Sequence, residues 1–144
     1  MSPELIFVIA NNGILIFWLL LIVAPRWRGT EIAVHSIAVP VILGLAYGWL
    51  LWRVWLGGEG AAGVNYTTLP GVMALFDTPT GAVMGWIHYL VFDLFVGAWT
   101  ARDAQRRGVP HWALVPCLIA ILMAGPVGLL IYLALRRVFL LKEA

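Results

Sequence analysis

Residues 86–103 read WIHYLVFDLFVGAWTARD, an apolar and aromatic stretch that contains a histidine, His88, and a carboxylate, Asp93. The apolar run around it, residues 81–101, is long enough to cross a bilayer as a helix, at roughly 1.5 Å per residue against about 30 Å of hydrocarbon. Ionisable side chains at that depth are costly, so they mark either a functional site or an internal packing contact. This stretch is therefore the expected centre of the fold and of any site.

The composition defines the class of protein. The chain has 144 residues, of which 62% are hydrophobic and 11% are charged, and its mean hydropathy is +0.95. Because soluble domains are about 25% charged, we expect an all-α integral membrane protein with a single domain, residues 1–144, and membrane lipids as partners. The few arginines form no basic stripe, which excludes nucleic acid as a partner. The single Cys117 fits no zinc-binding spacing, so no metal site is expected.

Hydrophobic runs and turn residues predict four transmembrane helices, with a long and partly apolar loop over residues 57–80 between helices 2 and 3. The predicted spans are residues 5–24, 32–56, 81–101 and 111–135. In the second span, Thr30 is expected to cap the helix and Pro40 to kink it. Thr78 and Pro79 are a favourable start for the third. The motif Gly-Pro-Val-Gly at 125–128 predicts a kink in the fourth, packed against the third.

Polar residues in these spans need partners. Asn11 and Asn12 interrupt the first span, which we expect to be retained in the mature protein, and either an interhelical hydrogen bond or a ligand contact would satisfy them. Asp103 and Arg107 stand four residues apart and predict a solvated pair of small energetic weight. The loop is either a flap over a lipophilic site or a surface loop.

Helical periodicity separates the third span into two polar or aromatic faces. One face carries His88, Phe92, Phe95 and Trp99, and the other carries Trp86, Tyr89, Asp93, Gly97 and Thr100. The two faces are roughly 140° apart at the helical repeat. Gly97 lies one turn after Asp93, and we expect it to leave space beside the carboxyl for a neighbouring backbone or a ligand.

The distribution of basic residues sets the orientation only weakly. An outside N-terminus places five arginines on the cytoplasmic side, and the reverse orientation places four basic residues there, among them Lys142. The small excess favours an outside N-terminus. We expect a multi-pass protein of the bacterial inner (cytoplasmic) membrane.

Two blocks of sequence resemble a known family. The first contains Trp86, His88, the run Phe92–Phe95, Gly97, Trp99 and the pair Arg102–Asp103; the second contains residues 116–118, 125–130 and 132–133. Together they resemble the abscisic-acid-deficient-four-like membrane family, whose plant members are needed for making neoxanthin from violaxanthin in plastid membranes. The resemblance implies a carotenoid-related or isoprenoid-related role. Many relatives carry an arginine where this chain has Ala98; if that arginine pairs with a carboxylate or binds substrate, the resemblance implies a different ligand for this chain.

Two classes of function follow. The first is a polyene isomerase or epoxide-opening isomerase, in which Asp93 donates a proton and His88 accepts one. The second is a non-enzymatic pigment-binding or accessory subunit of a larger photosynthetic membrane complex, in which an intramembrane histidine ligates a tetrapyrrole metal. A small transporter is a weaker alternative, because only one carboxylate lies deep in the membrane.

The predicted site contains two catalytic residues, Asp93 and His88, and a set of ligand-binding residues on the first and third spans. The ligand-binding residues are Trp86, Tyr89, Phe92, Gly97, Trp99 and Asn12. Eight tryptophans, six phenylalanines and four tyrosines supply flat surfaces for a polyene, although interface belts and core packing also use such residues. A carotenoid is the expected ligand or substrate, and a homo-oligomer or a larger complex the expected assembly.

Overall fold

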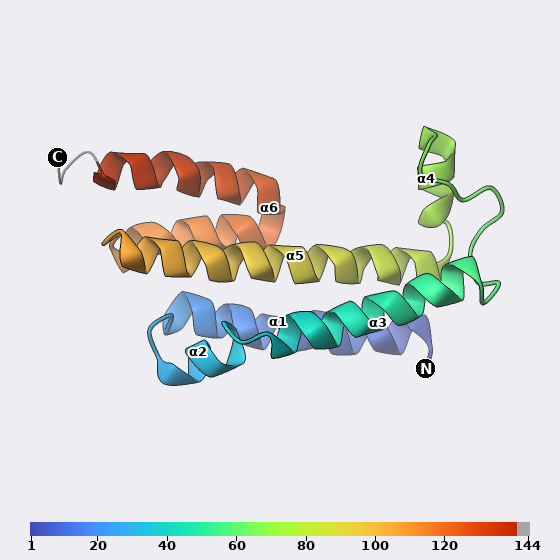
Figure 1. The fold of residues 1–144 in the computed structure, drawn as a ribbon, viewed down its shortest axis with the longest axis horizontal. Coiled ribbons are helices and arrows are strands. Elements are labelled where there is room, and N and C mark those ends of the chain that lie inside the picture. The colour runs from blue at the N-terminus through green and yellow to red at the C-terminus, as the bar shows by residue number, and fades with distance from the viewer. Residues whose placement is uncertain (141–144) are drawn as a thin grey trace. The chain divides into compact units, whose positions relative to one another are not determined.

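The computed structural model describes residues 1–140; Lys142, counted above for the orientation, lies outside the described residues. The described chain is helical and contains no strand, which confirms the predicted fold class. Its helices, in chain order, are α1 (Pro3–Val23), α2 (Arg28–Ala33), α3 (Ala38–Trp55), α4 (Leu69–Leu75), α5 (Pro79–Arg106) and α6 (His111–Leu140) (Figure 1).

Four segments are, by length and composition, candidates to cross a membrane, in agreement with the four apolar spans predicted from the sequence. They are Pro3–Val23, Arg28–Trp55, Pro79–Arg106 and His111–Phe139. The prediction of a single domain remains a prediction, because the contacts divide the chain into two compact units. Unit 1 contains residues 1–13 and 38–91, and unit 2 contains residues 14–37 and those from 92 onward. The helices α1 and α5 are continuous and contribute to both.

The second predicted span is interrupted before its proline. The helix α2 ends at Ala33 and α3 begins at Ala38, so Pro40 lies in the first turn of α3 and does not kink a continuous helix. Inside a helix, proline cannot donate a backbone hydrogen bond and its ring clashes with the carbonyl group one turn earlier. In the first turn of a helix neither effect matters, so proline is tolerated there. The predicted cap is also wrong: the hydroxyl of Thr30, inside α2, donates a hydrogen bond to the carbonyl of Ala24 at 2.7 Å.

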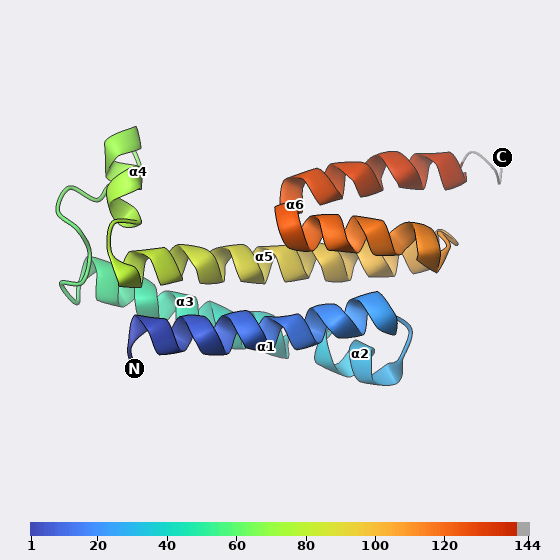
Figure 2. The same ribbon diagram turned by 180° about the vertical axis from the view of Figure 1, so that it is seen from behind.

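The helix α6 folds back on itself at Ala124, whose φ of −157° and ψ of 72° are not helical. Figures 1 and 2 show, from opposite sides, that the parts before and after this residue lie side by side and run in opposite directions. We call residues 111–123 the first limb and residues 125–140 the second limb. A Cβ built on Gly128 would overlap the backbone of Ile121, so the limbs are in direct contact. The predicted kink is confirmed, and it is a reversal of the chain (Figure 2).

The connection between α3 and α5 is an ordered structure within unit 1. Thr68 caps α4 by accepting a hydrogen bond from the amide of Gly71 at 3.2 Å. Thr78 caps α5 by accepting one from the amide of Gly81 at 3.1 Å, as predicted. The Asn65 side chain organises the turn before α4, where its Oδ1 accepts hydrogen bonds from two backbone amides at 3.0 Å. These contacts give the loop a defined shape, and its role as a flap stays a prediction.

Glu59 fastens this loop to both flanking helices. Its Oε1 accepts a hydrogen bond from Nε of Arg53 at 2.8 Å, and its Oε2 lies 2.6 Å from Nη2 of the same guanidinium. The hydroxyl of Thr80, at the start of α5, also donates to Oε2 at 2.6 Å. The glycine-rich part of the loop therefore has a fixed attachment point.

The attachment of Glu59 predicts a loop that opens in acid. The hydrogen bonds from Arg53 and Thr80 hold the pKa of Glu59 below its ordinary value of 4.5. Because the folded-state pKa is depressed, the stabilisation is present above the ordinary pKa and is lost as pH falls through the lowered value. The protection of residues 57–68 from hydrogen exchange, relative to the intrinsic rate at each pH, should fall over that range. In Glu59→Gln the protection should be low at all pH values, whereas Asp77→Asn, at an exposed acid in the same loop, should behave like the wild type. An acid step that survives in Glu59→Gln would contradict the assignment.

Candidate functional site

Asp93 lies on α5 in unit 2 and is buried, with 8% of its surface exposed. Its carboxyl group rests against the backbone of Gly125 at the reversal of α6, where a Cβ would overlap Oδ1. Only glycine permits this approach. The second limb begins at this interruption, and the first turn of a helix carries partial positive charge. The carboxyl therefore lies beside a broken helix inside an apolar span, an arrangement that membrane transporters use to hold charged groups.

The space beside Gly97 is filled by a tryptophan. We expected this glycine to leave room for a backbone or a ligand next to Asp93, but a Cβ on Gly97 would lie 2.6 Å from Cη2 of Trp18. Trp18 comes from the second half of α1 and is only 1% exposed. The small residue therefore accommodates core packing, and sequence reasoning missed Trp18 because nothing distinguished it from an interfacial tryptophan.

His88 and Asp93 have separate surroundings. The imidazole of His88 is exposed and belongs to unit 1. Its ring lies 5.6 Å from the ring of Tyr47 on α3, tilted by 53°. Phe92 belongs to unit 2 and its side chain is also exposed. The pairing of Asp93 and His88 as acid and base stays a prediction.

Two of the predicted ligand-binding residues join an aromatic cluster, which we define as Phe7, Asn11, Trp86 and Tyr89. The ring of Trp86 stacks on that of Tyr89 at a centroid distance of 5.4 Å and an interplanar angle of 28°. Its Nε1 donates a hydrogen bond to Oδ1 of Asn11 at 3.2 Å, and the centroid of the Phe7 ring lies 6.0 Å from that of Trp86. The predicted interhelical hydrogen bond is therefore confirmed for Asn11. Asn12, the predicted contact, is exposed and lies outside the cluster.

An apolar groove of about 270 Å³ borders this cluster. It lies between the first turns of α1 and α5, and Phe7 belongs to both the groove and the aromatic cluster. The other lining residues are Pro3, Glu4, Val8, Pro79, Ala82 and Val83. Unit 1 therefore presents a group of aromatic rings beside a small, open apolar groove.

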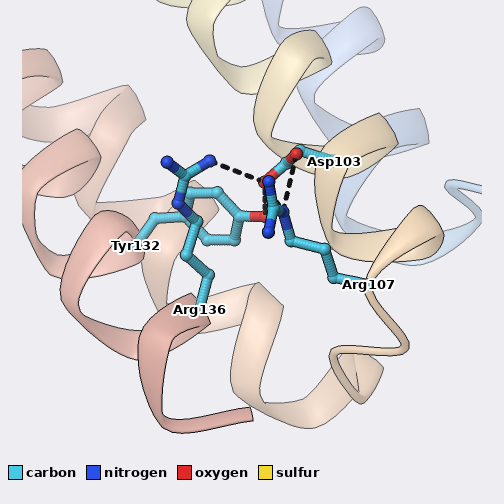
Figure 3. A network of polar contacts seen from close by, with 4 residues as sticks. All are labelled: Asp103, Arg107, Tyr132 and Arg136. Atoms are coloured by element: carbon cyan, nitrogen blue, oxygen red, sulfur yellow. Dashed lines mark hydrogen bonds and ion pairs between the residues drawn. The ribbon is translucent and has the colours of Figure 1, made fainter. Parts of the chain in front are cut away.

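A polar network in unit 2 gathers three residues around Asp103 (Figure 3). Its Oδ2 accepts hydrogen bonds from the Tyr132 hydroxyl at 2.7 Å and from Nη1 of Arg136 at 3.1 Å. Nε of Arg107 donates to both carboxylate oxygens, at 2.8 and 2.9 Å. We call these four residues the Asp103 network. The prediction of a solvated Asp103–Arg107 pair is wrong, because the Asp103 side chain is only 16% exposed and the second limb of α6 adds two donors.

Trp99 belongs to the surroundings of this network. Its ring meets that of Tyr132 edge-on at 5.9 Å, and the Arg136 guanidinium lies 5.6 Å from its centroid. Arginine placed over a tryptophan ring is a favourable cation–π contact. The predicted ligand-binding role of Trp99 is untested, and the contacts shown are with the second limb.

The described residues contain no group of three or more histidine, cysteine or acidic side chains that could hold a metal ion. The fold and the site together define a multi-span helical membrane protein with a buried carboxyl at a broken helix and an aromatic cluster beside an apolar groove. Comparison with known proteins assigns its family. The family model described as ABA DEFICIENT 4-like matches residues 5–132, so the chain belongs to this family.

A curated relative is similar along most of this chain. The chain is 28% identical over 110 residues to Protein ABA DEFICIENT 4, chloroplastic, of Arabidopsis thaliana, a match that covers 74% of this chain and 48% of the relative. The chain therefore spans about half the length of that protein. No solved structure matches the chain.

The Asp103 network predicts a measurable effect of one hydroxyl group. Tyr132→Phe removes a hydrogen bond to a largely buried carboxylate, and the free energy of unfolding should fall by about 1.5 kcal/mol. Unfolding in detergent micelles measures this loss. The control Tyr66→Phe, at an exposed tyrosine of unit 1, should change the free energy by less than about 0.5 kcal/mol. Equal effects of the two substitutions would contradict the network's contribution.

Proposed function

We propose that the chain binds a carotenoid or a related isoprenoid polyene within the membrane and isomerises it, with Asp93 as the proton donor. One observation carries the proposal: a buried carboxyl held against Gly125 at the reversal of α6. Membership in the ABA DEFICIENT 4-like family supports the substrate class, because the family resemblance implies a role in making neoxanthin from violaxanthin.

The chemistry needs no oxidant or reductant. In the opening of an epoxide, a proton is added to the oxygen, the C–O bond breaks and a carbocation forms; a proton then leaves carbon to a base, so the product is an isomer. In a polyene, proton addition to carbon gives an allylic cation that rotates and then releases a proton. A carboxyl group in an apolar site suits both reactions, because it can exchange the proton while water that would capture the cation is excluded.

Within unit 1, we propose that the aromatic cluster offers a contact surface for hydrocarbon, since flat rings such as Trp86 and Tyr89 offer a large contact area with little loss of rotamer freedom. For the second proton transfer we propose His88, whose ring is oriented by its contact with Tyr47.

A second candidate function is a pigment-binding accessory subunit, and the exposure of His88 favours it. An imidazole on the outer surface of a membrane helix can ligate the metal of a tetrapyrrole that approaches from the lipid. Asn12 supports association with another copy or a larger complex, because an exposed amide in an apolar helix is satisfied by a protein partner. We propose the bacterial cytoplasmic membrane as the location.

The proposal predicts that Asp93→Asn abolishes turnover without abolishing binding. Asparagine keeps the shape but cannot donate a carboxylic proton, so isomer formation should fall by about 100-fold or more. Purified protein in liposomes containing violaxanthin or an all-trans carotenoid is incubated, and the pigments are separated by chromatography. The absorption bands of the bound polyene should remain in the variant. Asp77→Asn, at an exposed acid outside the site, serves as the matched control.

The outcomes separate the two functions. Unchanged turnover in Asp93→Asn would refute the assignment of the proton donor. Bound carotenoid with no product in the wild type would favour the accessory role. A Soret-type band that disappears in His88→Ala would identify a tetrapyrrole.

A further inference from the structure

The reversal of α6 changes how many times the chain crosses the membrane. The first limb contains residues 111–123 and the second contains residues 125–140. At about 1.5 Å per residue, these limbs measure roughly 20 and 24 Å, whereas the hydrocarbon layer is about 30 Å thick. Over the described residues, neither limb alone is long enough to cross, although a straight α6 would be.

The second limb returns to the level at which the first limb begins. Tyr132 and Arg136, both on the second limb, bond to Asp103 near the C-terminal end of α5. In a straight α6 running antiparallel to α5, these residues would lie near the opposite end of α5. The second limb therefore runs back toward the connection between α5 and α6, as Figure 2 shows.

This placement collects basic residues on one side. Seven arginines belong to unit 2 and flank the end of α1, the end of α5 or the end of the second limb: Arg26, Arg28, Arg102, Arg106, Arg107, Arg136 and Arg137. The acidic residues near them are Glu31 and Asp103. Unit 1 contains one arginine, Arg53, and three acidic residues, Glu4, Glu59 and Asp77. A straight α6 would divide the basic residues of the sequence almost evenly between the two sides. With α6 folded back, the described residues of unit 2 carry seven arginines and those of unit 1 carry one.

We propose that the chain crosses the membrane three times, that α6 enters and leaves on one side as a re-entrant hairpin, and that the arginine-rich end rests on the anionic phospholipid headgroups of the cytoplasmic leaflet. Excess arginine in short connections faces the cytoplasm, and the negative surface of that leaflet attracts basic residues. Trp27 and Trp112, both exposed at this end, occupy positions typical of interfacial tryptophans. Arg26, Arg28, Arg106 and Arg137 are exposed and extend the positive surface.

Cysteine accessibility in the full-length protein tests the number of crossings. Cys117 is buried, and Cys117→Ala provides the background for single cysteines at Ala62→Cys in the α3–α5 loop, at His111→Cys, and appended to the C-terminus. A membrane-impermeant maleimide is applied to sealed right-side-out and inside-out vesicles. The C-terminal cysteine should label from the same side as His111→Cys, the cytoplasmic side, and opposite to Ala62→Cys. Labelling of the C-terminus together with Ala62→Cys would establish four crossings and overturn the proposal. Periplasmic labelling of His111→Cys would equally overturn the orientation.

Reconstitution tests the lipid partner. The midpoint of thermal unfolding should be higher in phosphatidylcholine vesicles that contain phosphatidylglycerol than in phosphatidylcholine alone. Arg28→Gln combined with Arg137→Gln should remove at least half of that shift, and high salt should reduce it. Arg53→Gln, at the opposite end, should keep the full shift even though it breaks the contact with Glu59. Equal midpoints in the two lipids, or equal losses in the two variants, would refute anionic lipid as the partner.

Discussion

The fold-back of α6 at Ala124 is the constraint on which the rest of unit 2 depends. Two glycines after the turn make it sterically accessible: Gly125 lets the Asp93 carboxyl approach the backbone, and Gly128 lets the two limbs touch. The turn then delivers Tyr132 and Arg136 to Asp103. A carboxylate with four hydrogen-bond contacts closes the structure at the far end of the limbs, so packing at the turn and polar contacts at the open end reinforce each other.

The same reversal explains how an ionisable group is tolerated within an apolar span. A continuous helix uses its N–H groups internally and offers little to a neighbouring carboxyl, whereas an interrupted helix presents the unsatisfied first turn of its second part. Asp93 lies at this point. Preorganised backbone dipoles around a proton-exchanging group can stabilise charge that develops during a reaction, because they need no reorganisation. The site is therefore described better by its position on a broken helix than by a list of side chains around the carboxyl.

Local signals in the sequence predicted much of the fold. The spans followed from hydrophobic length, the start of α5 from the hydroxyl of Thr78 before a proline, and the bond between Asn11 and Trp86 from the cost of an unsatisfied amide in lipid. The motif at 125–128 predicted a bend. The angle of that bend depends on the groups that pack against the two glycines, and these groups are far away in the chain or on the opposite limb. For that reason the Asp103 network could not be predicted, and the residue that fills the space at Gly97 could not be identified as Trp18.

The most direct test is a distance between the two ends of α6. Spin labels on Trp112→Cys and Val138→Cys, both at exposed positions, are measured by pulsed electron paramagnetic resonance in the Cys117→Ala background. A straight helix would separate the two backbone positions by about 39 Å. The hairpin predicts a distance far shorter than this, with a single narrow distribution. A distribution centred near the value for a straight helix would contradict the fold-back and, with it, the origin of both the Asp103 network and the Asp93 site.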